Sequence, residues 1–447
     1  MRRYASILAV LIVLVMTVLD GTLVNVALPM LGRDFGVSDS AAVWIVTCYQ
    51  LVITMLLLPL SSAGDLISYR RTFLSGVAIF TAASALCAAS VNFPMMLAAR
   101  SLQGVGAACV MGVNIALTRL IYPREILSRG LAVNAMVIAV ASAAGPTLSG
   151  AILSVASWRW LFLINIPLGI AAFIIGWKLL PLNPPKPVKE HFDWHSAVQN
   201  VLVFGLIFIA LGNLAHSKEV AANLLLIAAG VVLGIFYVRR QRGHRYPMLP
   251  VDLFRRRLFT LSISTSVCSF IAQNITLIAL PFLFVQGFGL PAFTTGLLMT
   301  PWPIATMIVS PFAARWAERH NPGITAAVGM GVFSLGVVSL ILLCWQGLAS
   351  PLHIAMRMTL CGVGFGMFQT PNNIVMVRAV PMERSGGAGG MQGTARLVGQ
   401  TGGATLVSLI FAAVATGTLA VETCLLTALG FALAAGGFSL SRSSLVK

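Results

Sequence analysis

Asp20 is an acidic residue inside a stretch, from about Ser6 to Pro29, that is otherwise apolar and long enough to cross a bilayer. The other acidic residues fall in predicted loops or close to predicted helix ends. A carboxylate within a membrane is costly, so by default it marks an ion, proton or substrate site. The alternative is that Asp20 pairs with a buried base and only holds helices together.

Arg100 is the candidate partner of Asp20, because it also lies inside an apolar stretch. Counted from the predicted outer ends of their helices, Arg100 and Asp20 lie about 9 and 10 Å below the membrane edge. These similar depths favour an ion pair or a water-linked pair, in which Arg100 regulates the protonation of Asp20. The alternative is that Arg100 anchors backbone carbonyl groups.

The remaining residue types suggest no catalytic chemistry. We find no nucleotide-binding loop and no catalytic set of loop residues, so an enzyme is not expected. The chain has 6 His, scattered through loops and helix ends, and 7 Cys, an odd number mostly within apolar stretches. This pattern predicts no metal site, no cofactor and no disulfide framework.

Composition places these residues in a polytopic membrane protein. The chain has 447 residues, of which 58% are hydrophobic and 9% charged, whereas a soluble protein has about 25% charged residues. We predict an all-α fold with fourteen spans, whose approximate limits are 6–29, 42–63, 72–91, 94–117, 131–155, 160–180, 195–214, 221–238, 259–286, 293–316, 323–346, 351–375, 388–417 and 420–440.

The net charge of +17 is a topology signal and does not indicate a nucleic-acid partner. With a cytoplasmic N-terminus, three basic residues fall at outer loops (Arg33, Arg159, Lys218) and three within spans (Arg100, Arg357, Arg396), and all the others lie on the inner side. The positive-inside rule therefore predicts that both termini are cytoplasmic. The arginines between Arg239 and Arg257 are expected to contact anionic lipid headgroups.

The chain repeats itself in order. Ala27-Leu28-Pro29 recurs as Ala279-Leu280-Pro281, and Gly104-Val105-Gly106 recurs as Gly362-Val363-Gly364. The number of residues between the two copies of each segment is larger than six helices need, and the excess is enough for about two more helices. We therefore predict parallel six-helix halves, residues 1–180 and 259–447, in a 6+2+6 arrangement. Residues 181–258 between them are predicted to be a linker, two inserted helices and a basic cytoplasmic loop.

Four motifs give the chain a resemblance to a known family: LDGTLVNVALP (Leu19–Pro29), Gly64-Asp65 with Tyr69-Arg70-Arg71, LAARSLQGVGAA (Leu97–Ala108), and Gly145-Pro146 with Gly150. The chain resembles a fourteen-helix drug:proton antiporter of the major facilitator superfamily, similar to bacterial methyl viologen and quaternary ammonium exporters. The resemblance covers nearly the whole chain. It implies proton and cation coupling at Asp20 and Arg100, a cytoplasmic gate at Gly64, Asp65, Arg70 and Arg71, and an antiporter motif at Gly145, Pro146 and Gly150.

Some features depart from this pattern. Ser61, Leu66 and Ser68 replace the usual residues of the gating loop, and span ten lacks the acid that helps some relatives to recognise dications. Family position and residue type suggest polar and aromatic lining of a central cavity, by Tyr49, Gln50, Gln103, Gln273, Asn274, Trp302, Phe368 and Gln369. Aromatic faces favour flat or quaternary cations, although each of these residues could equally be plain helix packing.

The resemblance implies proton-coupled export of lipophilic or quaternary cationic drugs by a monomer in a bacterial cytoplasmic membrane. The partners would be the small-molecule substrate, protons and membrane lipid. The alternative is a dedicated exporter of a metabolite, such as an amino acid or siderophore. The buried bases Arg357 and Arg396 would support that alternative.

Overall fold

The computed structural model describes residues 2–123, 126–183, 192–214, 219–243, 247–346, 350–380, 385–414 and 417–445, and their regular structure is helical. The predicted outer-loop residue Lys218, residues 184–191 of the predicted linker and residues 244–246 of the predicted basic loop lie outside this part. The first group of helices comprises α1 (Arg2–Phe35), α2 (Asp39–Leu66), α3 (Tyr69–Ala88), α4 (Phe93–Ile121), α5 (Leu127–Val155), α6 (Arg159–Leu163) and α7 (Asn165–Leu179).

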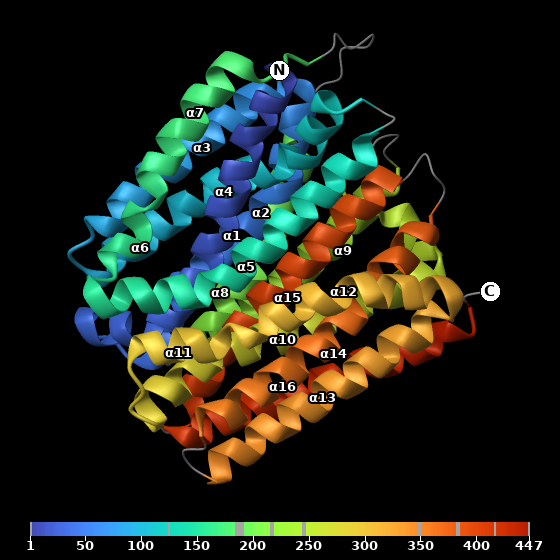
Figure 1. Cartoon of the computed structure of the whole chain (residues 1–447). Helices are drawn as coiled ribbons and strands as arrows, with labels where there is room; N and C mark the ends of the chain where they lie inside the picture. Colours follow the sequence, from blue (N-terminus) through green and yellow to red (C-terminus); the bar gives the residue numbers. More distant parts are fainter. Residues whose placement is uncertain are drawn as a thin grey trace.

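Two helices follow, α8 (Trp194–Asn213) and α9 (Val220–Gln241), and then a short 3₁₀ helix, η2 (Val251–Arg255). The second group comprises α10 (Arg257–Phe282), the π-helical turn η3 (Leu283–Gly287), α11 (Ala292–Met299), α12 (Pro301–Arg319), α13 (Pro322–Gln346), α14 (Pro351–Arg378), α15 (Ser385–Ala413) and α16 (Thr418–Ser443). In Figure 1 the two groups lie side by side, and both chain ends are marked at the same end of the bundle.

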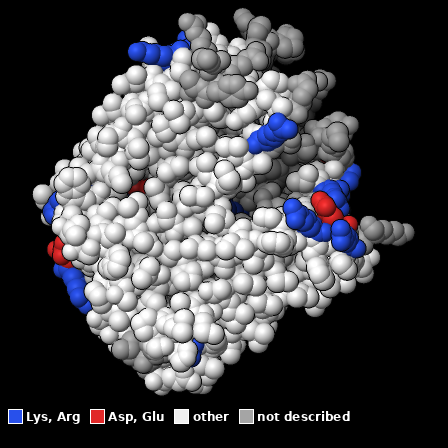
Figure 2. Space-filling view, in the orientation of Figure 1, with Lys and Arg blue, Asp and Glu red and all other residues white. Residues whose placement is uncertain are grey.

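Twelve helical segments of the described chain are long and apolar enough to cross a membrane. They correspond to twelve of the fourteen predicted spans, and α14 and α15 are not among them. Few charged side chains appear on the face shown in Figure 2, and most of these lie near its margins. An uncharged band of this kind is what contact with lipid hydrocarbon requires.

Two predicted spans are interrupted rather than straight. The sixth is divided into α6 and α7 at Ile164, and the tenth into α11 and α12 at Thr300. Pro301 and Pro303 follow the second break, and proline lacks the backbone N–H that would continue the hydrogen-bond ladder. By contrast, Pro29 and Pro281 lie inside α1 and α10, so proline alone does not predict a break.

The repeat seen in the sequence has a packing basis. A Cβ atom at Gly104 would lie 2.9 Å from the carbonyl oxygen of Tyr49 on α2, and one at Gly106 would lie 2.8 Å from Gly76 O on α3. Their second-half counterparts Gly362 and Gly364 meet α12 and α13 in the same way. Each glycine pair therefore lets one helix approach two neighbours at backbone distance.

Helices α8 and α9 pack against each other, and α8 also contacts α2 and α15. The first and second groups meet where α2 lies against α15 and where α5 lies against α11 and α12. The cysteines form no disulfide; five are buried and Cys268 and Cys344 are partly buried.

Candidate functional site

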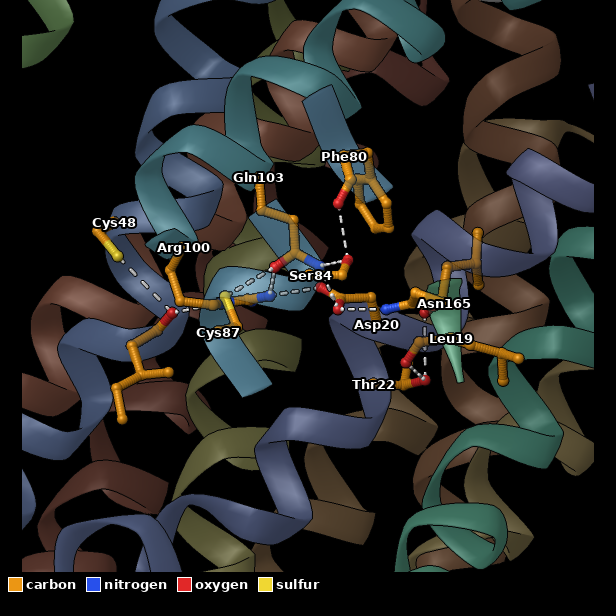
Figure 3. Close-up of polar contacts among 12 residues, drawn as sticks. Leu19, Asp20, Thr22, Cys48, Phe80, Ser84, Cys87, Arg100, Gln103 and Asn165 are labelled. Atoms are coloured by element: carbon orange, nitrogen blue, oxygen red, sulfur yellow. Dashed lines mark hydrogen bonds and ion pairs between the residues drawn. The ribbon is translucent and has the colours of Figure 1, made fainter. Parts of the chain in front are cut away.

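Asp20 and Arg100 form a buried ion pair in the first group of helices (Figure 3). Arg100 Nη1 on α4 lies 2.5 Å from Asp20 Oδ2 on α1, and both side chains are 0% exposed. Taking two charges out of water is costly, and the interior compensates only when the geometry is close and the remaining lone pairs are satisfied. Here the ion pair is direct, without a bridging water.

Side-chain amides complete the hydrogen bonding of the Asp20 carboxylate. Gln103 Nε2 donates to Asp20 Oδ1 at 2.8 Å, and Asn165 Nδ2 on α7 donates to the same oxygen at 3.2 Å. The Gln103 Oε1 atom accepts from Arg100 Nη1 at 2.5 Å, while its Nε2 also lies 2.9 Å from Ser84 Oγ on α3. Four helices therefore contribute to one polar cluster inside an apolar bundle.

Arg100 is further held by α2 and by aromatic rings. Its Nε donates to the carbonyl oxygen of Ile45 at 3.0 Å, and its guanidinium carbon lies 4.2 Å from the ring centroid of Tyr49 and 5.8 Å from that of Phe162. The Nη2 atom is buried and has no hydrogen-bond partner among the described residues. The two N–H donors of Nη2 are thus left over in the arrangement that pairs Arg100 with Asp20.

A second polar group joins the two halves of the chain near the middle of the helices. Asn274 Nδ2 on α10 donates to the Gln400 carbonyl oxygen on α15 at 2.6 Å and lies 3.4 Å from Gln50 Oε1 on α2. One turn beyond Gln50, the hydroxyl groups of Thr54 and Thr401 are 3.0 Å apart. Gln273, also a cavity candidate, is half-buried on α10.

The comparisons with known proteins identify the family. The model of the Major Facilitator Superfamily matches residues 10–404. The chain belongs to the Major Facilitator Superfamily. A solved POT family transporter, in complex with a thioalcohol-conjugated peptide, shares the fold at a TM-score of 0.74 and 14% identity, covering 98% of this chain and 96% of that one.

Curated relatives within the superfamily include transporters with different printed functions. The chain is 46% identical over 411 residues to the uncharacterized transporter YebQ of Escherichia coli, covering 92% of this chain and 89% of YebQ. It is 31% identical to the multidrug efflux pump LfrA of Mycolicibacterium smegmatis (92% and 81% covered) and 27% identical to the riboflavin transporter RibZ of Clostridioides difficile (92% and 89% covered). The chain is therefore a multi-pass membrane transporter of a small molecule and not an enzyme.

Two of the aromatic residues predicted to line a cavity, Trp302 and Phe368, are buried in this structure, and their role as cavity lining stays a prediction. Trp302 is 1% exposed and packs against Phe333 at 5.4 Å between ring centroids, and Phe368 is 0% exposed and packs against Phe365 at 5.8 Å. Both rings are core of the second group of helices in this structure. Tyr49 belongs to the Asp20 cluster, and Gln369 is half-buried on α14.

The predicted gate residues lie where α2 turns into α3, and Asn183, which follows α7, donates to Gly64 O at 3.5 Å. Asp65 is exposed and its Oδ1 accepts from the Tyr69 hydroxyl at 2.6 Å, and Arg70 donates to the carbonyl oxygen of Trp177. Arg71 is exposed. A Cβ atom at Gly64 would overlap the Val113 side chain, so this glycine is needed for α2 to approach α4.

The glycines around Pro146 form a seam between α1, α5 and α11. A Cβ atom at Gly145 would overlap Thr22 on α1, and one at Gly150 would lie 2.7 Å from Ala292 O and 2.9 Å from Phe293 Cα. From the other side, Gly296 on α11 faces the carbonyl of Pro146. The motif thus brings two halves of the transporter to backbone contact.

Two buried groups at the Asp20 cluster were not predicted as site residues, Ser84 and Asn165. Asn165 is the first residue of α7, and the signal that could have identified it is an isolated amide inside the apolar span predicted at 160–180. A second buried arginine, Arg442 on α16, was also missed because it is near a helix end. Its Nη1 donates to Ser262 Oγ at 2.9 Å and to Asn372 Oδ1, whereas its Nε is buried without a hydrogen-bond partner among the described residues.

Proposed function

We propose that this transporter is a proton-coupled exporter of lipophilic or quaternary cations that works by alternating access. In this proposal it belongs to the fourteen-helix drug:proton antiporters, similar to methyl viologen and quaternary ammonium exporters. The observation that carries the proposal is the fully buried Asp20–Arg100 pair with its amide partners. We further propose a monomer in a bacterial cytoplasmic membrane, with both termini cytoplasmic.

The fourteen-span arrangement needs α14 and α15 to cross the membrane. They have 28 and 29 residues, or about 42 Å each at about 1.5 Å per residue, which exceeds the hydrocarbon thickness of about 30 Å. Of their polar residues, Asn372 is buried and Arg396 is half-buried, whereas His353 and Arg378, near the two ends of α14, are exposed. We propose a 6+2+6 arrangement, with halves at residues 1–180 and 259–447 and α8 and α9 between them.

Charge arithmetic at Asp20 suggests how proton and substrate compete. The deprotonated pair with Arg100 is neutral overall, whereas protonation of Asp20 leaves the positive charge of Arg100 uncompensated. At an effective dielectric constant of about 20, two unit charges about 10 Å apart repel by about 1.7 kcal/mol, or roughly 15-fold in affinity. A proton on Asp20 and a cation in the centre would therefore each weaken the binding of the other, which is the coupling that antiport needs.

The contacts between halves fit one conformation of an alternating-access cycle. Ser40 Oγ donates to Ser408 O at 2.6 Å, and Gln286 Nε2 donates to Asp39 Oδ1 at 2.8 Å. These residues lie at the helix ends opposite the chain termini, together with the glycine seam at Gly150. We propose that this structure is closed at the outer end, and that the seam seals it against ions.

The test is ethidium efflux from cells that lack their own pumps, comparing the wild type with Asp20→Asn at matched expression, with and without an uncoupler. We expect efflux by the wild type that needs the proton gradient and is lost in the variant. Normal efflux by Asp20→Asn would refute the coupling role, and efflux that ignores the uncoupler would refute proton coupling.

A second candidate, export of a metabolite that carries a carboxylate, is favoured by Arg396. This residue is about 17 Å along α15 at about 1.5 Å per residue, and its Nε is buried without a hydrogen-bond partner in the described chain. Arg357, by contrast, donates to Ser339 O at 2.7 Å and to Gln346 Oε1 at 2.9 Å. Unlike Arg357, Arg396 is therefore a base that could receive a substrate anion, and an arginine fork suits a carboxylate.

Arg396→Gln separates the two candidates. A cationic cargo would be exported as fast or faster, because a positive charge near its path has been removed. A carboxylate cargo would lose its partner. Comparing the small molecules that accumulate outside cells with wild type, Asp20→Asn or Arg396→Gln would reveal such a cargo as a carboxylate compound that requires both residues.

A further inference from the structure

Helices α8 and α9 leave a groove of about 640 Å³ on the outside of the bundle. Its walls are apolar, with Phe204 and Ile207 from α8 and Val231 and Ile235 from α9. Gly230 lies at the contact between the helices, because a Cβ atom there would come within 2.8 Å of Ile207 Cγ1. A hydrocarbon chain fits the shape and the chemistry of these walls.

One end of the groove is positively charged. Arg239 and Arg242, at the end of α9, line it and are both exposed. The arginine between them in sequence, Arg240, is already paired with Asp193 at 3.4 Å. The residues that line the groove include no acid. An oxyanion at this end would therefore meet two guanidinium groups with no competing carboxylate of the groove.

A buried hydroxyl group lies beside the charged end. Tyr237 is 3% exposed and lines the groove, and its hydroxyl oxygen has no hydrogen-bond partner among the described residues. A buried polar group without a partner costs free energy, so a ligand that supplies one would be favoured. Apolar walls, two arginines and one unpartnered hydroxyl together describe an amphipathic anion.

We propose that the groove between α8 and α9 binds one anionic phospholipid of the cytoplasmic leaflet. One acyl chain lies along Phe204, Ile207, Val231 and Ile235, and the phosphate lies between Arg239 and Arg242 within reach of the Tyr237 hydroxyl. The leaflet follows from the proposed cytoplasmic termini, since α9 ends on that side. The site gives the two helices between the halves a role in lipid binding that is separate from transport.

The experiment is native mass spectrometry of the purified full chain with phosphatidylglycerol and phosphatidylcholine of identical acyl chains. We expect the wild type to retain phosphatidylglycerol preferentially. The double variant Arg239→Gln with Arg242→Gln should lower this preference by roughly 30-fold. Each basic residue near a lipid headgroup contributes about fivefold, and the two factors multiply. The control is Arg255→Gln with Arg257→Gln, which removes the same charge from exposed residues outside the groove.

Gly234→Leu tests the acyl chain separately, because a Cβ atom there faces Val203 at 3.5 Å and a larger side chain would enter the groove. It should reduce retention of both lipids while the arginines remain. Equal loss of phosphatidylglycerol in the control variant, or unchanged retention in both groove variants, would overturn the proposal. Full displacement by inorganic phosphate would also overturn it, since it would indicate an anion site without an acyl chain. Thermal unfolding of each variant shows whether it is folded, and none of these outcomes depends on transport.

Discussion

Asp20 Oδ2 and Arg100 Nη1 are 2.5 Å apart at a place where neither side chain has any exposed surface. The pair joins α1 to α4, and Gln103 and Asn165 bind the second carboxylate oxygen. Removing one member of such a pair leaves an isolated buried charge, whereas removing both does not. The structural and the coupling roles of Asp20 can therefore be separated by experiment.

Asp20→Asn is expected to lower the free energy of unfolding by about 3–5 kcal/mol, because Arg100 loses its counter-charge. The double variant Asp20→Asn with Arg100→Met should recover most of that stability but not transport. Thermal unfolding in detergent and ethidium efflux measure the two effects. If the double variant exports normally, the pair serves only to hold the helices together.

Gln103→Leu is expected to cost about 1–3 kcal/mol, since it removes a donor to Asp20 and leaves buried polar groups unsatisfied. Leu102→Ala on the same helix is the control, because Leu102 is 40% exposed. Thermal unfolding measures the difference. Equal effects of both changes would show that the amide contributes no more than ordinary helix packing.

Ser40→Cys with Ser408→Cys is expected to form a disulfide, because the two hydroxyl oxygens are 3.1 Å apart. The bond would hold the outer ends of α2 and α15 together and stop export, and a reducing agent should restore it. Gel mobility after limited proteolysis measures the cross-link. Export that continues while the link is intact would show that these ends need not separate.

Gly150→Ala is expected to impair export at least tenfold, because the added Cβ atom meets backbone atoms of α11 that cannot rotate away. Overpacking of this kind typically costs about 1–3 kcal/mol. Gly331→Ala on α13 is the matched control, since a Cβ atom there meets nothing within 4 Å. Efflux and thermal unfolding are measured for both, and similar results for the pair would contradict a seam role for Gly150.

The sequence predicted much of the helical organisation, because membrane spans are long and apolar. The Gly104 and Gly362 repeat was visible in the sequence, and both glycines pack on corresponding helices. The break at Thr300 was not predicted, because prolines such as Pro281 occur inside continuous helices as well. Hydropathy also separates α14 and α15 from the other long helices, since their polar residues lower the average.

The pairing of Asp20 with Arg100 could be predicted because depth in a membrane can be counted along each helix. The rotation of a helix about its axis cannot be counted in this way, since an almost uniformly apolar sequence gives little indication of which face is turned inward. The assignment of Trp302 and Phe368 to a cavity therefore stays a prediction, and both side chains are buried in this structure. Asn165 was missed for the same reason. It follows the break between α6 and α7, and its side chain donates to Asp20 on α1.

The cysteines of this chain have a practical consequence for spectroscopy. None forms a disulfide, five are buried, and Cys268 and Cys344 are partly covered. Thiol-reactive probes should therefore label new surface cysteines much faster than they label the native thiols. Pairs of fluorophores or spin labels on the two halves could then report their separation during the cycle without first replacing every native cysteine.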